Sequence, residues 1–200
     1  MSYPVTFEAD YAEQRNRLTA FFRLLLAIPL AIWLYIYGLV ASIGIVIAWF
    51  AIVITGRYPK GLYDFVAGFT LLLTRVTAYV ALLADPYPPW TGAAEPDYPV
   101  RMTFAGPLEQ YSRAKTFFRI ILAIPLLVVR YAMNILLQIG AVGAWFIIVF
   151  TGRMPADLFN LMVLANSYMA RSDSYIYLLT ETYPPFQDDE TRSAGLVAEG

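Results

Sequence analysis

The stretch RLLLAIPLAIWLYIYGLVASIGIVIAWFAIVITGRYP at residues 23–59 decides the class of this protein. No charged side chain lies between Arg23 and Arg57, and the run is longer than the roughly 20 apolar residues that one membrane crossing needs. A second stretch, RIILAIPLLVVRYAMNILLQIGAVGAWFIIVFTGRMP at residues 119–155, has the same pattern with Arg130 as its one internal charge. The sequence therefore predicts an all-α integral membrane protein.

The composition of the whole chain supports this class. Hydrophobic residues make up 59% of the 200 residues and charged residues 14%, whereas a soluble domain is about 25% charged. A net charge of -1 provides no basic face, so we expect no nucleic-acid partner. The chain has neither Cys nor His, which removes thiol chemistry and the commonest metal ligand. We therefore expect no metal, no cofactor, no catalytic residues and no enzymatic activity.

The two stretches belong to a longer internal repeat with a constant offset of 96 positions. The register holds without a gap from Glu13 to Pro89, and it keeps Arg, Pro, Gly and Trp residues that a shared apolar composition would not align. The retained motifs are FFR at 21–23 and 117–119, AIPL at 27–30 and 123–126, TGR at 55–57 and 151–153, and YPP at 87–89 and 183–185. We predict a first unit at 1–92, a second unit at 93–186 and a disordered acidic tail at 187–200.

Each unit contains the same parts in the same order. A short β-type segment comes first, at 4–9 and at 99–104. A basic stretch and the long apolar run follow. A third segment, at 62–84 and 158–180, carries polar residues on one side at helical spacing. That spacing predicts an amphipathic helix, which lies either in the membrane interface or packed beneath the preceding helices.

The length of the apolar run decides the predicted number of crossings. A single helix over residues 24–55 would measure about 48 Å, against a hydrocarbon core of about 30 Å. We therefore predict a transmembrane helical hairpin with its turn in the region from Gly38 to Gly44, and an equivalent hairpin in the second unit. Basic residues lie at the entrance and exit of each run and none lies at the turn. By the positive-inside rule this predicts four crossings in two parallel repeats, with both termini cytoplasmic.

A second topology stays open, in which each run is one strongly tilted span and the third segment returns through the membrane. This arrangement would place Arg57 and Lys60 outside the cell, and Arg171 and Asp173 near the middle of the bilayer. Both placements are unfavourable for charged side chains. The hairpin topology is therefore the favoured prediction.

A polar stripe distinguishes the second apolar run from the first. Arg130 lies 11 residues beyond Arg119, so about 16 Å further along a helix, and Asn134 and Gln138 follow on the same face. The first unit has Leu34, Gly38 and Ser42 at these positions. The stripe is a candidate contact for a lipid phosphate, an anionic ligand or an acidic residue of a partner. The structural alternative is that Arg130 extends to the interface and the amides bond neighbouring helices.

Four more arginines are candidate lipid or partner contacts. Arg57 and Arg153 belong to Thr-Gly-Arg-x-Pro turns, where glycine suits a left-handed helix cap and arginine complements the helix dipole or reaches head groups. Arg75 and Arg171 lie on the polar sides of the third segments. We expect them to lie on a solvated face there, and to pair with Asp64, Asp157 or Asp173, or with lipid phosphate.

The motifs, taken in order, resemble the bacterial membrane domain of unknown function family 4389. The resemblance rests on Arg17 and Arg23 before Ile28-Pro29, then on AWF at 48–50, TGRYP at 55–59, RVTAY at 75–79 and YPPW at 87–90. It extends over both units, although the second has Met154 for the tyrosine and Ser172-Asp173 for Val-Thr. The resemblance implies a bacterial membrane protein, and it supplies no catalytic residue or substrate.

These observations lead to an expected function. We expect a non-enzymatic membrane scaffold or accessory subunit in the bacterial inner (plasma) membrane. It would bind membrane lipids, a partner membrane complex, or both, with a protein partner or a homo-oligomer as its assembly. The alternative is a small transporter or channel formed by oligomerised repeats.

Overall fold

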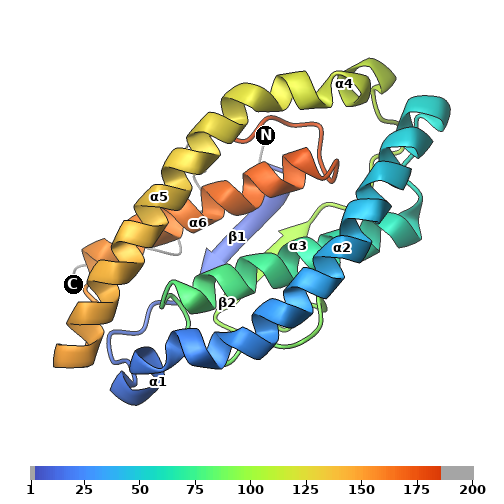
Figure 1. Cartoon of the computed structure of the whole chain (residues 1–200). Helices are drawn as coiled ribbons and strands as arrows, with labels where there is room; N and C mark the ends of the chain where they lie inside the picture. Colours follow the sequence, from blue (N-terminus) through green and yellow to red (C-terminus); the bar gives the residue numbers. More distant parts are fainter. Residues whose placement is uncertain (1–2, 186–200) are drawn as a thin grey trace.

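The computed structural model describes residues 3–185 and shows the same order of elements twice (Figure 1). The first unit contains β1 (Val5–Ala9), α1 (Arg17–Phe21), α2 (Arg23–Thr55) and α3 (Lys60–Val80), and the second contains β2 (Val100–Phe104), α4 (Arg113–Phe117), α5 (Arg119–Thr151) and α6 (Ala156–Ile176). The fold is therefore a structural duplication, as the sequence repeat predicts. The acidic tail predicted at 187–200 lies outside the described residues.

Each long apolar run forms one continuous helix of 33 residues, α2 or α5. The predicted turn between Gly38 and Gly44, and with it the two helical hairpins, is wrong. Both glycines lie inside α2, where a Cβ on Gly44 would be 3.1 Å from Leu62 and one on Gly38 would be 3.3 Å from Phe69. The glycines serve the close approach of α2 to α3, and a sequence alone does not separate this use of glycine from a turn.

The long helices attach to the rest of the protein by a narrow stripe. Buried residues recur three or four positions apart, with one gap of eleven in each helix, and these spacings place them on one side of the helix. They occupy equivalent positions in the two units: Arg23, Ala27, Leu30, Ala41, Gly44, Ala48 and Ile52 in α2, and Arg119, Ala123, Leu126, Leu137, Gly140, Ala144 and Ile148 in α5. The stripe of α2 faces α3 and that of α5 faces α6, so most of the circumference of both long helices is exposed and apolar.

The third segments are helical, as predicted, but they form the core of the protein. Both α3 and α6 are buried along most of their length, and they pack against each other. Their polar sides are enclosed by protein: the hydroxyl of Thr70 donates to the Val66 carbonyl and that of Ser172 to the Tyr168 carbonyl. Of the two predicted placements, packing beneath the preceding helix is therefore correct. The polar sides of α3 and α6 do not face solvent.

The two β-type segments are confirmed as strands, and they pair with each other across the units. The antiparallel register sets Phe7 opposite Met102, with Val5 opposite Phe104 and Ala9 opposite Val100 on either side. At the strands the repeat has an offset of 95, because Tyr3-Pro4-Val5 recurs as Tyr98-Pro99-Val100, so these two flanking pairs are equivalents of each other. A pseudo-twofold axis therefore passes through the centre of the ladder and relates the two units.

The strands and the long helices lie on opposite faces of the central helices. On α3, Leu62 and Val66 contact Gly44 of α2, whereas Arg75 donates from Nε to the Val100 carbonyl of β2, 3.2 Å away. These positions face opposite sides of a helix. The molecule thus has three layers, with the ladder behind α3 and α6 in Figure 1.

In each unit, the segment before the first short helix is hydrogen-bonded to the C-terminal end of the other unit's long helix. The Arg15 amide donates to the Gly152 carbonyl over 2.9 Å, and the equivalent Tyr111 amide donates to the Gly56 carbonyl over 2.8 Å. Gly56 and Gly152 both have φ of 75°, so the predicted left-handed caps are confirmed. Because α2 begins where α5 ends, the two long helices run antiparallel along the molecule (Figure 1).

Candidate functional site

The polar stripe of α5 begins with an ion pair inside the chain. Arg130 donates from Nε and Nη2 to the two carboxylate oxygens of Asp173 on α6, at 2.7 and 3.0 Å. The Asp173 side chain is 7% exposed and that of Arg130 is 28% exposed. A two-pronged contact of this kind fixes orientation as well as charge. Arg130 is therefore neutralised within the protein, by a residue that the sequence analysis places on a solvated face.

The same place in the first unit carries no charge. The equivalents of Arg130 and Asp173 are Leu34 and Thr77, and Leu34 packs against the buried cluster of Leu30, Leu72 and Val76. Both partners differ between the units, so neither unit keeps an unpaired charge at this point. The ion pair is a local property of the second unit.

The remainder of the stripe faces a groove between the two units. Asn134 and Gln138 line a hollow of about 260 Å³ together with Thr77, Val80 and Leu137. Gln138 also borders a second hollow of about 360 Å³, whose lining includes Leu24 and Trp145. The groove is mostly apolar, with two amides, one hydroxyl and the charged residue Arg23 in its wall. This surface suits an extended apolar group that carries a hydrogen-bonding head, such as part of a lipid.

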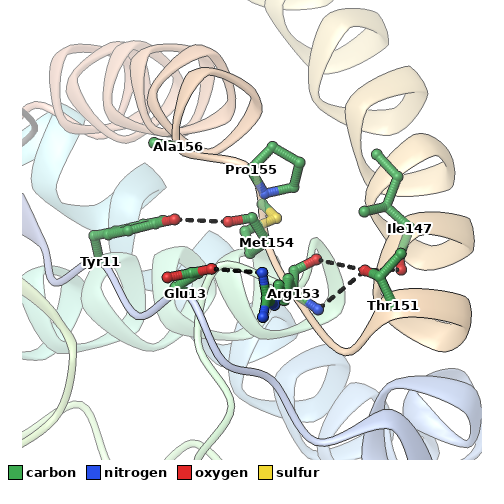
Figure 2. Close-up of a pocket in the computed structure, with 8 residues that line it drawn as sticks. All are labelled: Tyr11, Glu13, Ile147, Thr151, Arg153, Met154, Pro155 and Ala156. Carbon is green, nitrogen blue, oxygen red and sulfur yellow. Dashed lines mark hydrogen bonds and ion pairs between the residues drawn. The ribbon is translucent and has the colours of Figure 1, made fainter.

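Arg57 and Arg153 are exposed at the ends of the long helices. Figure 2 shows the second of these ends, where a hollow of about 620 Å³ is bordered by Tyr11, Glu13 and residues 153–156. The Tyr11 hydroxyl donates to the Met154 carbonyl over 2.7 Å, and Arg153 lies 3.7 Å from Glu13. Water reaches this loose ion pair, so the guanidinium is available to an anion.

Arg75 and Arg171 are each 1% exposed, and lipid phosphate cannot reach them in this structure. Arg75 donates to the carbonyls of Val100 and Ala93, while Arg171 donates from Nη2 to the Ser167 hydroxyl, 3.1 Å away. The prediction of a solvated face at these positions is wrong, because β2 and the loop before it cover α3. Arg75 therefore ties α3 to β2 and to the loop before it, whereas Arg171 bonds to Ser167 within α6.

Two arginines at the beginnings of the long helices have buried contacts that their place in a basic stretch does not predict. Arg23 and Arg119 are buried, and their guanidinium groups lie 4.2 Å from the ring centre of Tyr79 and 3.9 Å from that of Tyr175. Arg23 also binds Asp85 at 2.7 Å. The guanidinium nitrogens of Arg119 have no hydrogen-bond partner within residues 3–185. The sequence carries one signal of this contact: Arg23 and Tyr79 recur together as Arg119 and Tyr175.

The outer face of the ladder carries a separate charged group. Arg101 binds Glu8 at 3.1 Å and Asp10 at 2.6 Å. The hydrogen bonds that Arg101 donates to the carboxylates of Asp10 and Glu8 hold the pKa of Arg101 above its ordinary value, although partial burial opposes this. All three side chains remain partly exposed. This face is therefore polar, whereas the opposite layer of the molecule is apolar.

The fold and these contacts define a class: a duplicated helical protein with membrane-compatible long helices. Among residues 3–185, α2 and α5 are the two helices long and apolar enough to cross a membrane, with mean hydropathies of 2.4 and 2.2. Only 22% and 17% of their most apolar windows are buried, whereas the core helix of a soluble protein would be largely enclosed. The exposed apolar surface indicates association with a membrane.

The comparison with protein families supports the sequence resemblance. The chain belongs to the family described as Domain of unknown function (DUF4389), whose model matches it twice, at residues 17–91 and 113–187. The predicted family and the two tandem copies are therefore confirmed. Both matched segments contain the helices of a unit and leave out its strand. No curated protein and no solved structure gives a significant match to the chain.

Proposed function

We propose that this protein is a non-enzymatic membrane scaffold or accessory subunit that binds lipid through α2 and α5. The observation that carries the proposal is the continuous apolar surface of these two helices. It includes side chains that are more than half exposed at both ends and in the middle of each helix, such as Leu24, Ile43 and Ile54 of α2 and Ile120, Ile139 and Phe150 of α5. Exposed apolar surfaces of this extent mark membrane or protein contacts.

Exposed cations at the helix ends support binding to anionic lipid. Arg57, Arg113 and Lys115 are exposed near the end of α2, and Arg17 and Arg153 near its beginning. Each cation at a membrane surface contributes about 1 kcal/mol of attraction to anionic lipid. Lipid phosphate is therefore the ligand that we assign to Arg57 and Arg153.

The use of the buried charges supports a non-enzymatic role. Arg130 is neutralised by Asp173 and Arg23 by Asp85, so these groups stabilise the fold. The groove between the units presents the amides of Asn134 and Gln138 and the hydroxyl of Thr77. Neutral amides do not act as general acids or bases near neutral pH. We assign the groove to a lipid or to a segment of a partner.

The test is binding of the purified chain to vesicles with and without anionic phospholipid. The wild type should float with both kinds of vesicle and prefer the anionic kind. Arg57→Gln and Arg153→Gln should each lower binding to the anionic vesicles about fivefold, which corresponds to about 1 kcal/mol. Arg101→Gln, a matched change on the opposite face, should leave this preference unchanged. A wild-type chain that remains unbound to either vesicle would overturn the proposal.

A transporter or channel of oligomerised repeats is the second candidate, because Asn134 and Gln138 form a polar line in an otherwise apolar groove. Native mass spectrometry from mild detergent separates the two candidates. A complex with another membrane protein favours the scaffold. A homo-oligomer that also conducts anions in liposomes, with conductance reduced by Gln138→Leu, favours transport.

A further inference from the structure

The two ends of the long-helix layer carry similar charge. One end combines the beginning of α2 with the end of α5 and holds Arg15, Arg17, Arg23 and Arg153; the other holds Arg57, Lys60, Arg113, Lys115 and Arg119. The positive-inside rule counts lysine and arginine near the ends of a membrane segment. It therefore gives no preference for which end of this layer would face the cytoplasm.

A transmembrane orientation would also move charged groups to the middle of the bilayer. A twofold axis that relates two antiparallel helices is perpendicular to both of them. If α2 and α5 crossed the membrane, the axis would lie in its mid-plane, and so would the centre of the ladder at Phe7 and Met102. Glu8 and Arg101 are next to this centre, and Asp10 is about 10 Å away along the strand. Charged groups at that depth are strongly disfavoured.

The length of the helices adds an independent argument. A helix of 33 residues is about 50 Å long, whereas the hydrocarbon core is about 30 Å thick. A spanning α2 would need a steep tilt, because its exposed apolar side chains extend from Leu24 to Ile54 with no charged residue between them. A helix lying in the plane of the membrane has no such length limit.

We infer that α2 and α5 lie side on in a single anionic leaflet, with the three-layer fold on one side of the membrane. This inference rests on the membrane association proposed above and specifies how the long helices are oriented relative to the membrane. Basic residues at both ends of the layer then reach phosphates of the same leaflet, and the Arg101 group of the ladder faces water. The pseudo-twofold axis runs along the membrane normal, which keeps the two repeats parallel, as the sequence analysis expects.

Spin labels along one face of α2 test this orientation. Leu25, Ile36 and Ile47 are 62%, 48% and 54% exposed, and they are 11 residues apart, which places them on one side of the helix about 16 Å from each other. The chain lacks cysteine, so Leu25→Cys, Ile36→Cys and Ile47→Cys each give one labelling site. The variants are reconstituted into vesicles of phosphatidylcholine and phosphatidylglycerol, and depth is measured by collision with oxygen and with a water-soluble nickel complex.

The one-leaflet orientation predicts similar depths at the three positions and a water-exposed label at Thr103→Cys on the ladder. A label at position 36 that is deeper than both others by about 10 Å or more would show a spanning helix. Sidedness gives a second readout: Glu13→Cys and Lys60→Cys, at opposite ends of the layer, should react with an impermeant maleimide from the same side of cell-derived membranes.

The outcomes separate this inference from the proposed function. A membrane-bound chain that shows a depth maximum at position 36, or reaction of positions 13 and 60 from opposite sides, overturns the orientation alone. A chain that does not bind the vesicles overturns the proposed function as well.

Discussion

The contact between α5 and α6 differs from the equivalent contact between α2 and α3 at its most central positions. Arg130 and Asp173 form an ion pair in the second unit, where the first unit has Leu34 and Thr77. A neighbouring position shows a similar exchange, since Gly38 approaches Phe69 in the first unit while their equivalents are Asn134 and Ala165. The duplication therefore kept the shape of the contact and allowed its chemistry to diverge in compensating pairs.

The largest effect is expected from breaking the ion pair on one side. Asp173→Thr leaves Arg130 partly buried without its partner, which should lower stability by about 3 kcal/mol. The double variant Arg130→Leu with Asp173→Thr recreates the pair of the first unit and should recover most of this loss. Thermal unfolding in mild detergent measures both. A double variant as unstable as the single one would contradict the compensating exchange.

The two buried entrance arginines provide the next comparison. Arg23→Leu leaves Asp85 without its 2.7 Å partner, whereas Arg119→Leu removes a guanidinium that has no hydrogen-bond partner within residues 3–185. Loss of the hydrogen bonds of a charged group costs about 2 kcal/mol, so Arg23→Leu should lower the midpoint of unfolding more than Arg119→Leu. Equal shifts in the two variants would show that the stacking on tyrosine, which both share, dominates.

A smaller difference in stability between the units is expected from substitutions at the helix caps. Gly56→Ala and Gly152→Ala both place a side chain at a φ of 75°, which costs about 1 kcal/mol. In addition, a Cβ on Gly152 would lie 2.8 Å from Arg17 Nε, while one on Gly56 would lie 3.5 Å from Arg113 Nε. Gly152→Ala should therefore be the more destabilising change in thermal unfolding. The opposite order would mean that Arg17 moves away freely.

The smallest effect is expected on the outer face of the ladder. Arg101 is 28% exposed and its partners Glu8 and Asp10 are more than half exposed, so Arg101→Gln should cost less than about 1 kcal/mol. Raising the salt concentration should reduce the difference from wild type, because exposed charges are screened. A loss of stability as large as that of Asp173→Thr would show that the Arg101 ion pairs are essential to the fold.

Much of the architecture could be predicted from residue patterns. The repeat identified two equivalent units, Pro and β-type residues identified the strands, and Gly56 and Gly152 identified the helix caps. The turn at Gly38 to Gly44 was wrong because glycine indicates either a turn or close helix contact. The partner of Arg130 was missed because Asp173 is 43 residues away, and only the packing of α6 on α5 brings them together.

By itself, the sequence determined that the protein has two equivalent units with long apolar helices, since composition and register depend only on the order of residues. The tertiary structure decided that these helices are unbroken and antiparallel, that α3 and α6 fill the core, and that Arg75 and Arg171 are enclosed. The physical reason is that helical periodicity shows which side chains share a face. What lies against that face, lipid or protein, depends on the pairing of the two units around their common axis.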